Sequence, residues 1–190
     1  KLSSLSFFSM IMPDEDKLDR YMIGKSTSAA LDFAAIMAMS ARIFAEYEHI
    51  FPNISEKALV AAERAWNWAV ANPEVYYNNP IDVHTGNYKD SHLADEKFWA
   101  ASELFITTGK QSYYNELDFS EAFTVPEWHT VNTLGLMSLT LHKEKLPETS
   151  EVLQQFKTLT DSVFATYKTS VNKVPIDRFN WGSNGMISSA

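Results

Sequence analysis

Apolar side chains return every three or four residues along most of this chain, and that spacing constrains the fold more than any other feature. It is the period of an α-helix that turns one face toward a core. The strict alternation of a half-buried strand occurs only in short pieces. The sequence therefore predicts an all-α protein, with at least five helices between residues 26 and 172 and less than about 10% strand. The clearest stripe is Val152, Phe156, Leu159, Val163 and Tyr167.

Residues 25–28 offer capping side chains for a long first helix. Its apolar residues fall on two faces, so this helix is expected to pack on two sides. Small side chains on one of the faces would let a neighbouring helix approach closely. The large face comprises Phe33, Ile36, Met37, Phe44 and Tyr47, and the small face comprises Leu31, Ala34, Ala35, Ala38 and Ala45.

Capping patterns mark the next two helices. Asn53 followed by Glu56 resembles a capping box, and the helix that it opens is expected to stop before Pro73. Ser91 can cap a third helix, which should end at Gly109 because glycine readily adopts the left-handed conformation of a helix end.

Two later helices are expected to begin near Pro126 and Pro147. The order of helix pairs and loops indicates stacked antiparallel helix hairpins, as in an α/α toroid or solenoid. Two loops interrupt the hairpins, at residues 73–92 and 173–182. The first has about twenty residues, and a loop of that length in a compact domain is usually functional.

Composition excludes several function classes. The net charge is −8 and no basic stripe is present, so nucleic acid is a poor candidate for a partner. The chain has no cysteine, which excludes disulfides, thiolate metal sites and a cysteine nucleophile. The five histidines form no HxH or HxxxH pair that would indicate zinc. Residues 29–45 are interrupted by Asp32, Ser40 and Arg42, and they fall short of the pattern expected for a membrane span.

Four segments resemble glycoside hydrolase family 9, which contains endoglucanases and cellobiohydrolases. The segment 24–38 matches one stretch of that family, and residues 12–16 with Arg20 and Tyr21 match the stretch just before it. Residues 86–109 are similar to the family's Asp-Glu-x-x-Trp-Ala-Ala-x-Glu-Leu helix, and residues 180–184 to its Trp-Gly-Ser-Asn loop. The order and the spacings both fit, so the resemblance covers essentially the whole chain.

The resemblance implies an (α/α)6 barrel, of which residues 1–190 would be a single internal piece amounting to about half. It also implies hydrolysis of β-1,4-glucan with inversion, which needs two carboxyl groups about 6.5–9.5 Å apart with a water between them. In the family the base belongs to an Asp-Ala-Gly-Asp motif, and the acid is a Glu near the end of the domain. Neither motif occurs in this chain, so we expect it to hold no catalytic acid or base.

Aromatic and polar residues in the loops are the candidates for binding β-glucan or a cello-oligosaccharide. Indole rings can stack on the apolar faces of sugar rings while nearby polar groups bind the hydroxyls. The alternative for each is ordinary packing or capping at a helix start. Trp66, Trp68 and Trp99 lie within helical stripes and are expected in the core. The candidates for the substrate cleft are Trp181, Trp128, Asn184, Ser183, Tyr88 and Asp90.

Asp95 and Glu96 have two interpretations. Adjacent carboxylates in the first turn of a helix suit the helix dipole. The resemblance adds a structural calcium ion, held by this pair and by the backbone carbonyls of Ser91 and His92. A further family Asp ligand corresponds to Thr130, which removes one negative charge. No other cofactor is implied.

Three functions remain open on sequence grounds. The first is a piece of a secreted, periplasmic or cell-surface glucanase whose partner is the remainder of its own catalytic domain. The second is a carbohydrate-binding or degenerate barrel that has lost catalysis. The third is a helical-hairpin scaffold for protein partners. A repeat with a polar concave face would favour this third function, but the loops of this sequence are aromatic and irregular instead.

Overall fold

The computed structural model describes residues 2–3, 12, 14, 21–22, 24–81, 83, 86–148, 150–179 and 182–190. Across these residues the fold is all-α apart from two strands of two residues each, so the predicted fold class is confirmed. The strands β1 (Leu2–Ser3) and β2 (Tyr21–Met22) pair antiparallel, with Leu2 opposite Met22. The helices are α1 (Thr27–Ala45), α2 (Ile54–Ala71), α3 (Ala94–Thr108), α4 (Gln111–Tyr114), α5 (Asn132–Leu141), the 3₁₀-helix η1 (Lys143–Lys145), α6 (Val152–Thr169) and α7 (Ser183–Ser189).

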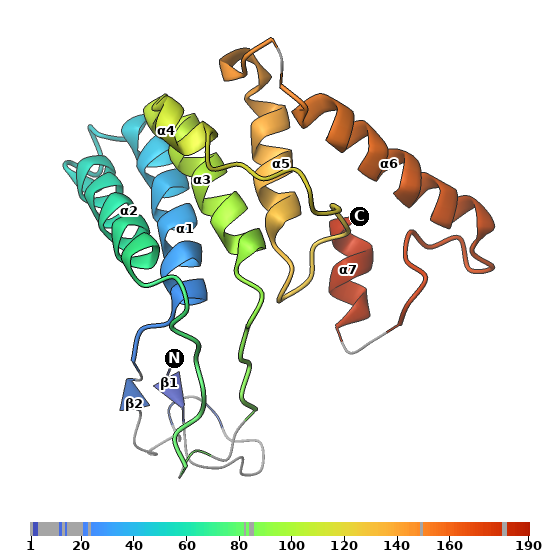
Figure 1. The fold of residues 1–190 in the computed structure, drawn as a ribbon, viewed down its shortest axis with the longest axis horizontal. Helices are drawn as coiled ribbons and strands as arrows, with labels where there is room; N and C mark the ends of the chain where they lie inside the picture. The colour runs from blue at the N-terminus through green and yellow to red at the C-terminus, as the bar shows by residue number, and fades with distance from the viewer. Residues whose placement is uncertain are drawn as a thin grey trace.

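The helices α1, α2, α3 and α5 form a layer in which α1 packs between α2 and α3, and α5 packs on the other side of α3 (Figure 1). The core lies between these helices and is richest on α3, where every residue from 98 to 106 is buried. The helix α6 touches α5 and otherwise extends away from the layer (Figure 1).

The small face of α1 is the buried one. Ala34, Ala35 and Ala38 are fully buried, whereas Phe33 and Ile36 on the large face are about half exposed. Packing on the large face therefore stays a prediction, because the described helices of this chain leave most of that face uncovered. Helices can approach α1 closely only over its alanines, and α2 and α3 both occupy that side.

The helix α1 is also long and apolar enough to cross a membrane, by length and composition alone. The expectation that its polar residues disqualify this stretch was too strict. Within the fold, the fully buried alanines of α1 contact the neighbouring helices, which is the packing of a core helix.

The helix boundaries correct several expectations. Ser26 caps α1 as predicted and accepts a hydrogen bond from the Ala29 amide. Asn53 precedes α2, but its left-handed backbone (φ 63°) gives no side-chain cap, so the capping box does not form. The helix α3 begins at Ala94 after Leu93, and Ser91 does not cap it. Gly109 ends α3 in the left-handed conformation, as predicted (φ 68°).

The two prolines expected at helix starts lie further upstream. The helix α5 begins six residues after Pro126, because residues 127–130 first close a small hairpin. The helix α6 begins five residues after Pro147. Pro147 accepts a turn hydrogen bond from the Ser150 amide, 3.0 Å away, and so belongs to the connection.

The helix α5 crosses α3 at very short range, at Gly135. A Cβ atom at this position would lie 2.8 Å from Ser102 Oγ and 3.0 Å from the Cα of Trp99. Only glycine therefore fits without moving the α3 backbone. This contact fixes how closely the beginnings of α3 and α5 approach each other.

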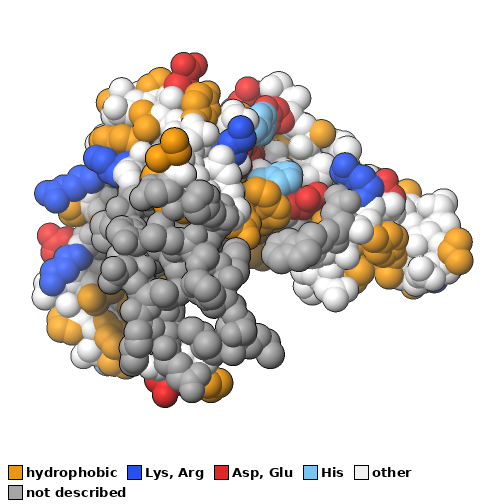
Figure 2. Space-filling model, turned by 90° about the horizontal axis from the view of Figure 1, so that it is seen from below, with side chains coloured by type: hydrophobic (Ala, Val, Ile, Leu, Met, Phe, Trp, Pro, Cys, Tyr) orange, Lys and Arg blue, Asp and Glu red, His pale blue; other side chains and the backbone are white. Residues whose placement is uncertain are grey.

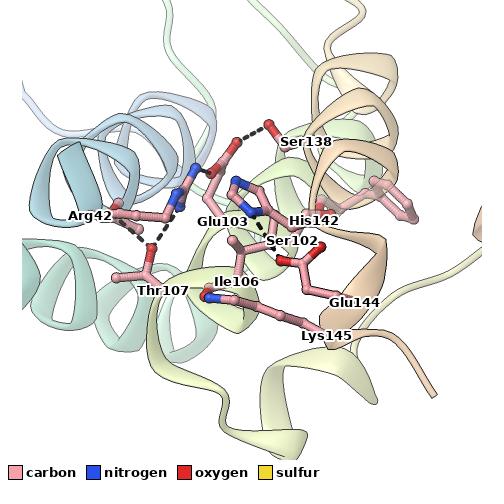
Figure 3. A network of polar contacts seen from close by, with 11 residues as sticks. Arg42, Ser102, Glu103, Ile106, Thr107, Ser138, His142, Glu144 and Lys145 are labelled. Atoms are coloured by element: carbon pink, nitrogen blue, oxygen red, sulfur yellow. Dashed lines mark hydrogen bonds and ion pairs between the residues drawn. The ribbon is translucent and has the colours of Figure 1, made fainter.

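Polar contacts join the C-terminal halves of α1, α3 and α5 (Figure 3). The Arg42 guanidinium donates to Oε2 of Glu103 at 2.8 Å, and the Ser138 hydroxyl donates to Oε1 of the same carboxylate at 2.5 Å. Lys145 donates to the Ile106 carbonyl, also at 2.5 Å. Glu103 is fully buried, and both of its oxygens are paired.

Candidate functional site

The N-terminal ends of α1, α3 and α5 lie at one end of the helix layer, together with the loop between α2 and α3 and the last part of the connection from α4 to α5 (Figure 1). Figure 2 shows the molecule from that end, where histidine, acidic and hydrophobic side chains gather beside one another. Most of the residues predicted to bind substrate or metal come from these two loops and the helix starts that follow them.

Trp128 is held at the tip of a short hairpin. Glu127 and Thr130 exchange backbone hydrogen bonds of 3.1 and 3.2 Å, and Trp128 lies between them with 60% of its surface exposed. Its ring meets Tyr88 edge to face, with centroids 6.0 Å apart, and His129 in the same manner at 4.8 Å. The structure thus brings together two predicted cleft residues, Tyr88 and Trp128, here called the aromatic pair.

Tyr88 reaches this position through an unusual backbone. Its φ is +46°, a conformation that few residues other than glycine adopt. A Cβ atom on Gly86 would lie 2.7 Å from the Tyr88 ring, so the absence of a side chain at Gly86 leaves room for that ring. Tyr88 is 59% exposed, so the loop presents this ring to solvent beside Trp128.

Asp90 has a local role that sequence reasoning did not anticipate. It is half-buried, and its Oδ1 accepts a hydrogen bond from the His92 amide at 2.9 Å. The His92 ring in turn lies 2.9 Å from Oε2 of Glu121. This hydrogen bond raises the pKa of His92 above its usual value. Asp90 therefore holds the turn from which the His92 side chain reaches Glu121, and this contact joins the loop before α3 to the connection before α5.

A polar cavity of about 450 Å³ opens beside Trp128. Its walls come from the start of α3, the start of α5 and the loop between residues 121 and 130, and Arg178 closes one side. Glu121, Arg178 and Asn132 were not singled out from the sequence. They surround the cavity only because separate segments fold together, and no local pattern marks them.

Asp32, Asp90, Asp95 and Glu96 lie close enough for their charges to interact. Burial, with smaller contributions from the charges of Asp95 and Asp90, raises the pKa of Asp32 to about 6. Burial also raises the pKa of Glu96 well above its usual range, with the charge of Asp95 as the next contribution. Carboxyl groups crowded in this way hold protons or attract a cation.

The start of α3 fits a hard cation in part. Asp95 and Glu96 are 1% and 3% exposed, and Asp95 Oδ1 and Glu96 Oε2 find no hydrogen-bond donor among the residues described. Buried carboxylate oxygens without donors are the ligands that calcium prefers. Ser91 and His92 precede them in an exposed turn, where backbone carbonyls could add to the set. In the described part of the chain, no three His, Cys, Asp or Glu side chains form a metal cluster.

The last predicted loop is described only in part. Trp181 and Asn180 lie outside the described residues, so the role of Trp181 stays a prediction. Ser183 is half-buried and Asn184 exposed in the first turn of α7, after Gly182 in a left-handed conformation (φ 87°). Gly182 is the capping residue, so the alternative in which Ser183 or Asn184 caps this helix is wrong.

Two of the three helical tryptophans lie in the core as predicted, whereas the prediction is wrong for Trp68. Trp66 and Trp99 are 6% and 8% exposed, which confirms the packing interpretation. Trp68 is half-buried, and the Lys25 ammonium lies 4.5 Å from its ring centroid.

The chain is similar in sequence and in structure to several known proteins. A xyloglucan-specific endo-β-1,4-glucanase of Bacteroides ovatus is 43% identical over 147 residues, covering 73% of this chain and 25% of that protein. A solved family 9 structure from Bacteroides ovatus covers 95% of this chain and 36% of its own, with 34% identity and a TM-score of 0.82. A complex of a related enzyme with cellobiose-like isofagomine covers 99% of this chain and 37% of its own, with 25% identity and a TM-score of 0.84.

The chain spans only about a quarter to a third of the length of the curated relatives it matches first. Residues 5–190 match the model of glycosyl hydrolase family 9. The motifs at residues 24–38 and 86–109 fold into α1 and α3, and their beginnings meet at the acidic residues described above. The chain belongs to glycosyl hydrolase family 9.

Proposed function

We propose that this chain forms one wall of a β-1,4-glucan cleft in a larger (α/α)6 catalytic barrel, whose remainder is its main partner. The aromatic pair carries the proposal. Two half-exposed rings at right angles, beside a polar cavity, offer an apolar face and a set of hydroxyl-binding groups in one place. That combination suits a sugar ring, which is apolar on its faces and polar at its edge.

Each predicted residue then has a part in binding. The Trp128 indole stacks on one glucose face, and Tyr88 supports that indole from the side. Asp90 contributes indirectly, because its carboxylate accepts the hydrogen bond from the His92 amide that holds the turn at the edge of the cleft. Trp181, Ser183 and Asn184 belong to the same cleft in this proposal. Met186 of α7 and Arg178 share a smaller pocket with Glu127, next to the hairpin that carries Trp128.

The acid and base of an inverting reaction come from outside this chain in our proposal. Asp95 and Glu96 are adjacent and buried in one helical turn, so they cannot flank a sugar from opposite sides with a water between. Asp32 is also largely buried, and it faces the same cluster. The barrel as a whole hydrolyses the glucan, while this piece positions it.

We also infer that the protein works outside the cytoplasm, in the medium, the periplasm or at the cell surface. A polymeric glucan cannot cross a membrane, so an enzyme that cuts it must meet it there. The preferred glucan is not specified by these residues. One matched relative is specific for xyloglucan by name, whereas others are named as endoglucanases or a cellobiosidase.

Cello-oligosaccharide titration of the natural polypeptide tests the cleft. Trp128→Ala should weaken binding by about 1–3 kcal/mol, by analogy with the loss of a stacking platform for a base. Phe164→Ala is the matched control, because Phe164 is similarly exposed (55%) but lies on α6. Equal affinity of Trp128→Ala and the unmodified protein would contradict the proposal.

A reducing-sugar assay separates the enzyme from a carbohydrate-binding barrel without catalysis. The natural polypeptide should release reducing ends from β-glucan, whereas residues 1–190 alone should release none. Binding without release by the natural polypeptide would favour the degenerate barrel. Activity in residues 1–190 that disappears on mutation of one of their own carboxylates would overturn our assignment of the acid and base.

A further inference from the structure

Asn132, the first residue of α5, has an amide oxygen that no described part of the chain satisfies. The residue is 3% exposed, and its Nδ2 donates to the Ala122 carbonyl at 3.4 Å. Its Oδ1 is buried without a donor. Leaving such an acceptor unpaired costs about 1–3 kcal/mol, so a buried orphan oxygen calls for a ligand or another donor.

Asp95 presents a second orphan oxygen at the same place. Its Oδ2 accepts a hydrogen bond of 2.9 Å from the amide of Val131, and Val131 is the residue just before Asn132. Its Oδ1 has no donor in the described structure, and Glu96 Oε2 next to it has none either. Asp95 and Asn132 both line the polar cavity beside Trp128. Unpaired acceptors of Asp95 and Asn132 therefore line one cavity where the starts of α3 and α5 meet, and the unpaired oxygens of Glu96 and Asp32 belong to carboxyl groups that interact with Asp95.

The basic groups around this cavity already face other carboxylates. His92 is paired with Glu121 at 2.9 Å, and His129 lies 3.8 Å from Glu127. Arg178 is 71% exposed and 3.8 Å from Asp177. These pairs leave the buried side-chain acceptors without a donor, among the described residues, as one oxygen each of Asp32, Asp95, Glu96 and Asn132. Carboxylate and amide oxygens, with no nitrogen or sulfur among them, are the donor set of a calcium ion.

We propose that the amide oxygen of Asn132 is a ligand of the calcium ion held by Asp95 and Glu96. This rests on the calcium site that the family resemblance implies at Asp95 and Glu96, which is itself a proposal. It shares the polar cavity with the proposed glucan cleft, but its test does not depend on glucan binding. Thr130, where a carboxylate was expected, leaves the site one ligand short. Asn132 supplies the missing oxygen from the adjacent helix start, but it brings no negative charge. The ion thereby joins α3 to α5, and its affinity is lower than a third carboxylate would give.

Calcium titration of the natural polypeptide by calorimetry, after treatment with a chelator, tests this assignment. Loss of even an outer partner of a bound metal usually lowers affinity by about 10–100-fold, so Asn132→Ala should lose at least about tenfold. Asn132→Asp restores the oxygen and adds a charge, so it should bind calcium more tightly than the unmodified protein. Thr133→Ala is the matched control. Thr133 is buried on the same turn, but its hydroxyl already donates a hydrogen bond to the Thr124 carbonyl. The calcium affinity of Thr133→Ala should therefore equal that of the unmodified protein.

The outcomes are distinct. Unchanged affinity in folded Asn132→Ala overturns the assignment of Asn132 and leaves Asp95 and Glu96 as the site. If Asn132→Ala does not fold, affinity in Asn132→Asp equal to or weaker than in the unmodified protein overturns it instead. If the unmodified protein binds no calcium, both calcium assignments fail. The cello-oligosaccharide titration is scored separately, so that result leaves the proposed cleft standing.

Discussion

The Nη2 atom of Arg42 lies 2.8 Å from Oε2 of Glu103, and the two side chains differ sharply in exposure. The Glu103 side chain is fully buried, whereas that of Arg42 is 21% exposed. The carboxylate can be buried because Arg42 and Ser138 together occupy both of its oxygens. The buried carboxylate of Glu103 on α3 is therefore bound by one side chain from α1 and one from α5.

Removing the cation should destabilise the fold strongly. Arg42→Ala leaves Glu103 as an uncompensated buried charge, which typically costs about 3–5 kcal/mol. Urea unfolding of the variant would show this loss. Arg64→Ala is a suitable control, because Arg64 is exposed on α2 and its removal should change stability by about 0.5 kcal/mol or less. Similar unfolding midpoints for the two variants would show that the Glu103 network contributes little.

Gly135→Ala should lower stability even though alanine favours helix formation. The new methyl group would meet Ser102 and the α3 backbone at Trp99, and such overpacking costs about 1–3 kcal/mol. Gly185→Ala in α7 makes a matched comparison, because nothing lies within 4 Å of its Cβ position. That change should be neutral or should stabilise by up to about 1 kcal/mol. Opposite signs in thermal unfolding are the expected result, and equal signs would argue against the close crossing of α3 and α5.

Stability without calcium should fall as the pH rises from about 4 to 6. The pKa of Asp32 is about 6 in the folded chain against an ordinary 3.8, because burial disfavours its charged form. In this window the folded chain keeps a proton that the unfolded chain has lost, so raising the pH favours unfolding, by about 1–2 kcal/mol after screening. Asp32→Asn should reduce that slope in chelator-treated protein, and the part that remains comes from Glu96, whose pKa is also raised. Asp161→Asn, on the exposed face of α6, should keep it.

Calcium should raise the melting temperature and release protons on binding. The raised pKa of Glu96, caused by burial and the charge of Asp95, means that its proton must leave before the carboxylate can bind metal. Calorimetric scans with and without chelator measure the first effect, and titrations in two buffers of different ionisation enthalpy measure the second. An unchanged melting temperature would leave the favourable helix dipole as the better account of Asp95 and Glu96.

Trp181→Ala should weaken cello-oligosaccharide binding far more than Trp66→Ala at an equal folded fraction. Trp66 is buried and packs edge to face on Tyr113, with centroids 5.6 Å apart. Its loss should therefore cost about 3–5 kcal/mol of stability. Thermal unfolding and oligosaccharide titration of both variants separate the two roles. If Trp181→Ala unfolds the protein while binding per folded molecule is unchanged, Trp181 is a core residue.

The sequence predicts helices better than it predicts which of their faces are covered. Ser26 and Gly109 were placed correctly because each acts on its own neighbours in the chain. The large apolar face of α1 is predicted to pack, but the described helices leave most of it exposed, because burial depends on what lies opposite in space. Asn53 fails as a cap for a related reason, since its backbone conformation is set by the turn that enters α2.

The candidate site shows the same limit. Tyr88 and Trp128 were each chosen as loop aromatics, but their contact joins segments forty residues apart in the chain. Asn132 could not be recognised at all, because a polar residue at a helix start is normally interpreted as a cap. Its unpaired oxygen is visible only in the folded chain, where Asn132 and Asp95 line the same cavity.

The Glu103 network and the acidic residues occupy opposite ends of the same helices. Asp95 and Glu103 are eight residues apart on α3, or about 12 Å along its axis. The end with Glu103 holds the helices together, whereas in our proposal the loops at the other end meet the glucan. On that proposal, loop residues can change without weakening the contacts around Glu103, so the choice of glucan can evolve while the helical scaffold stays under unchanged selection.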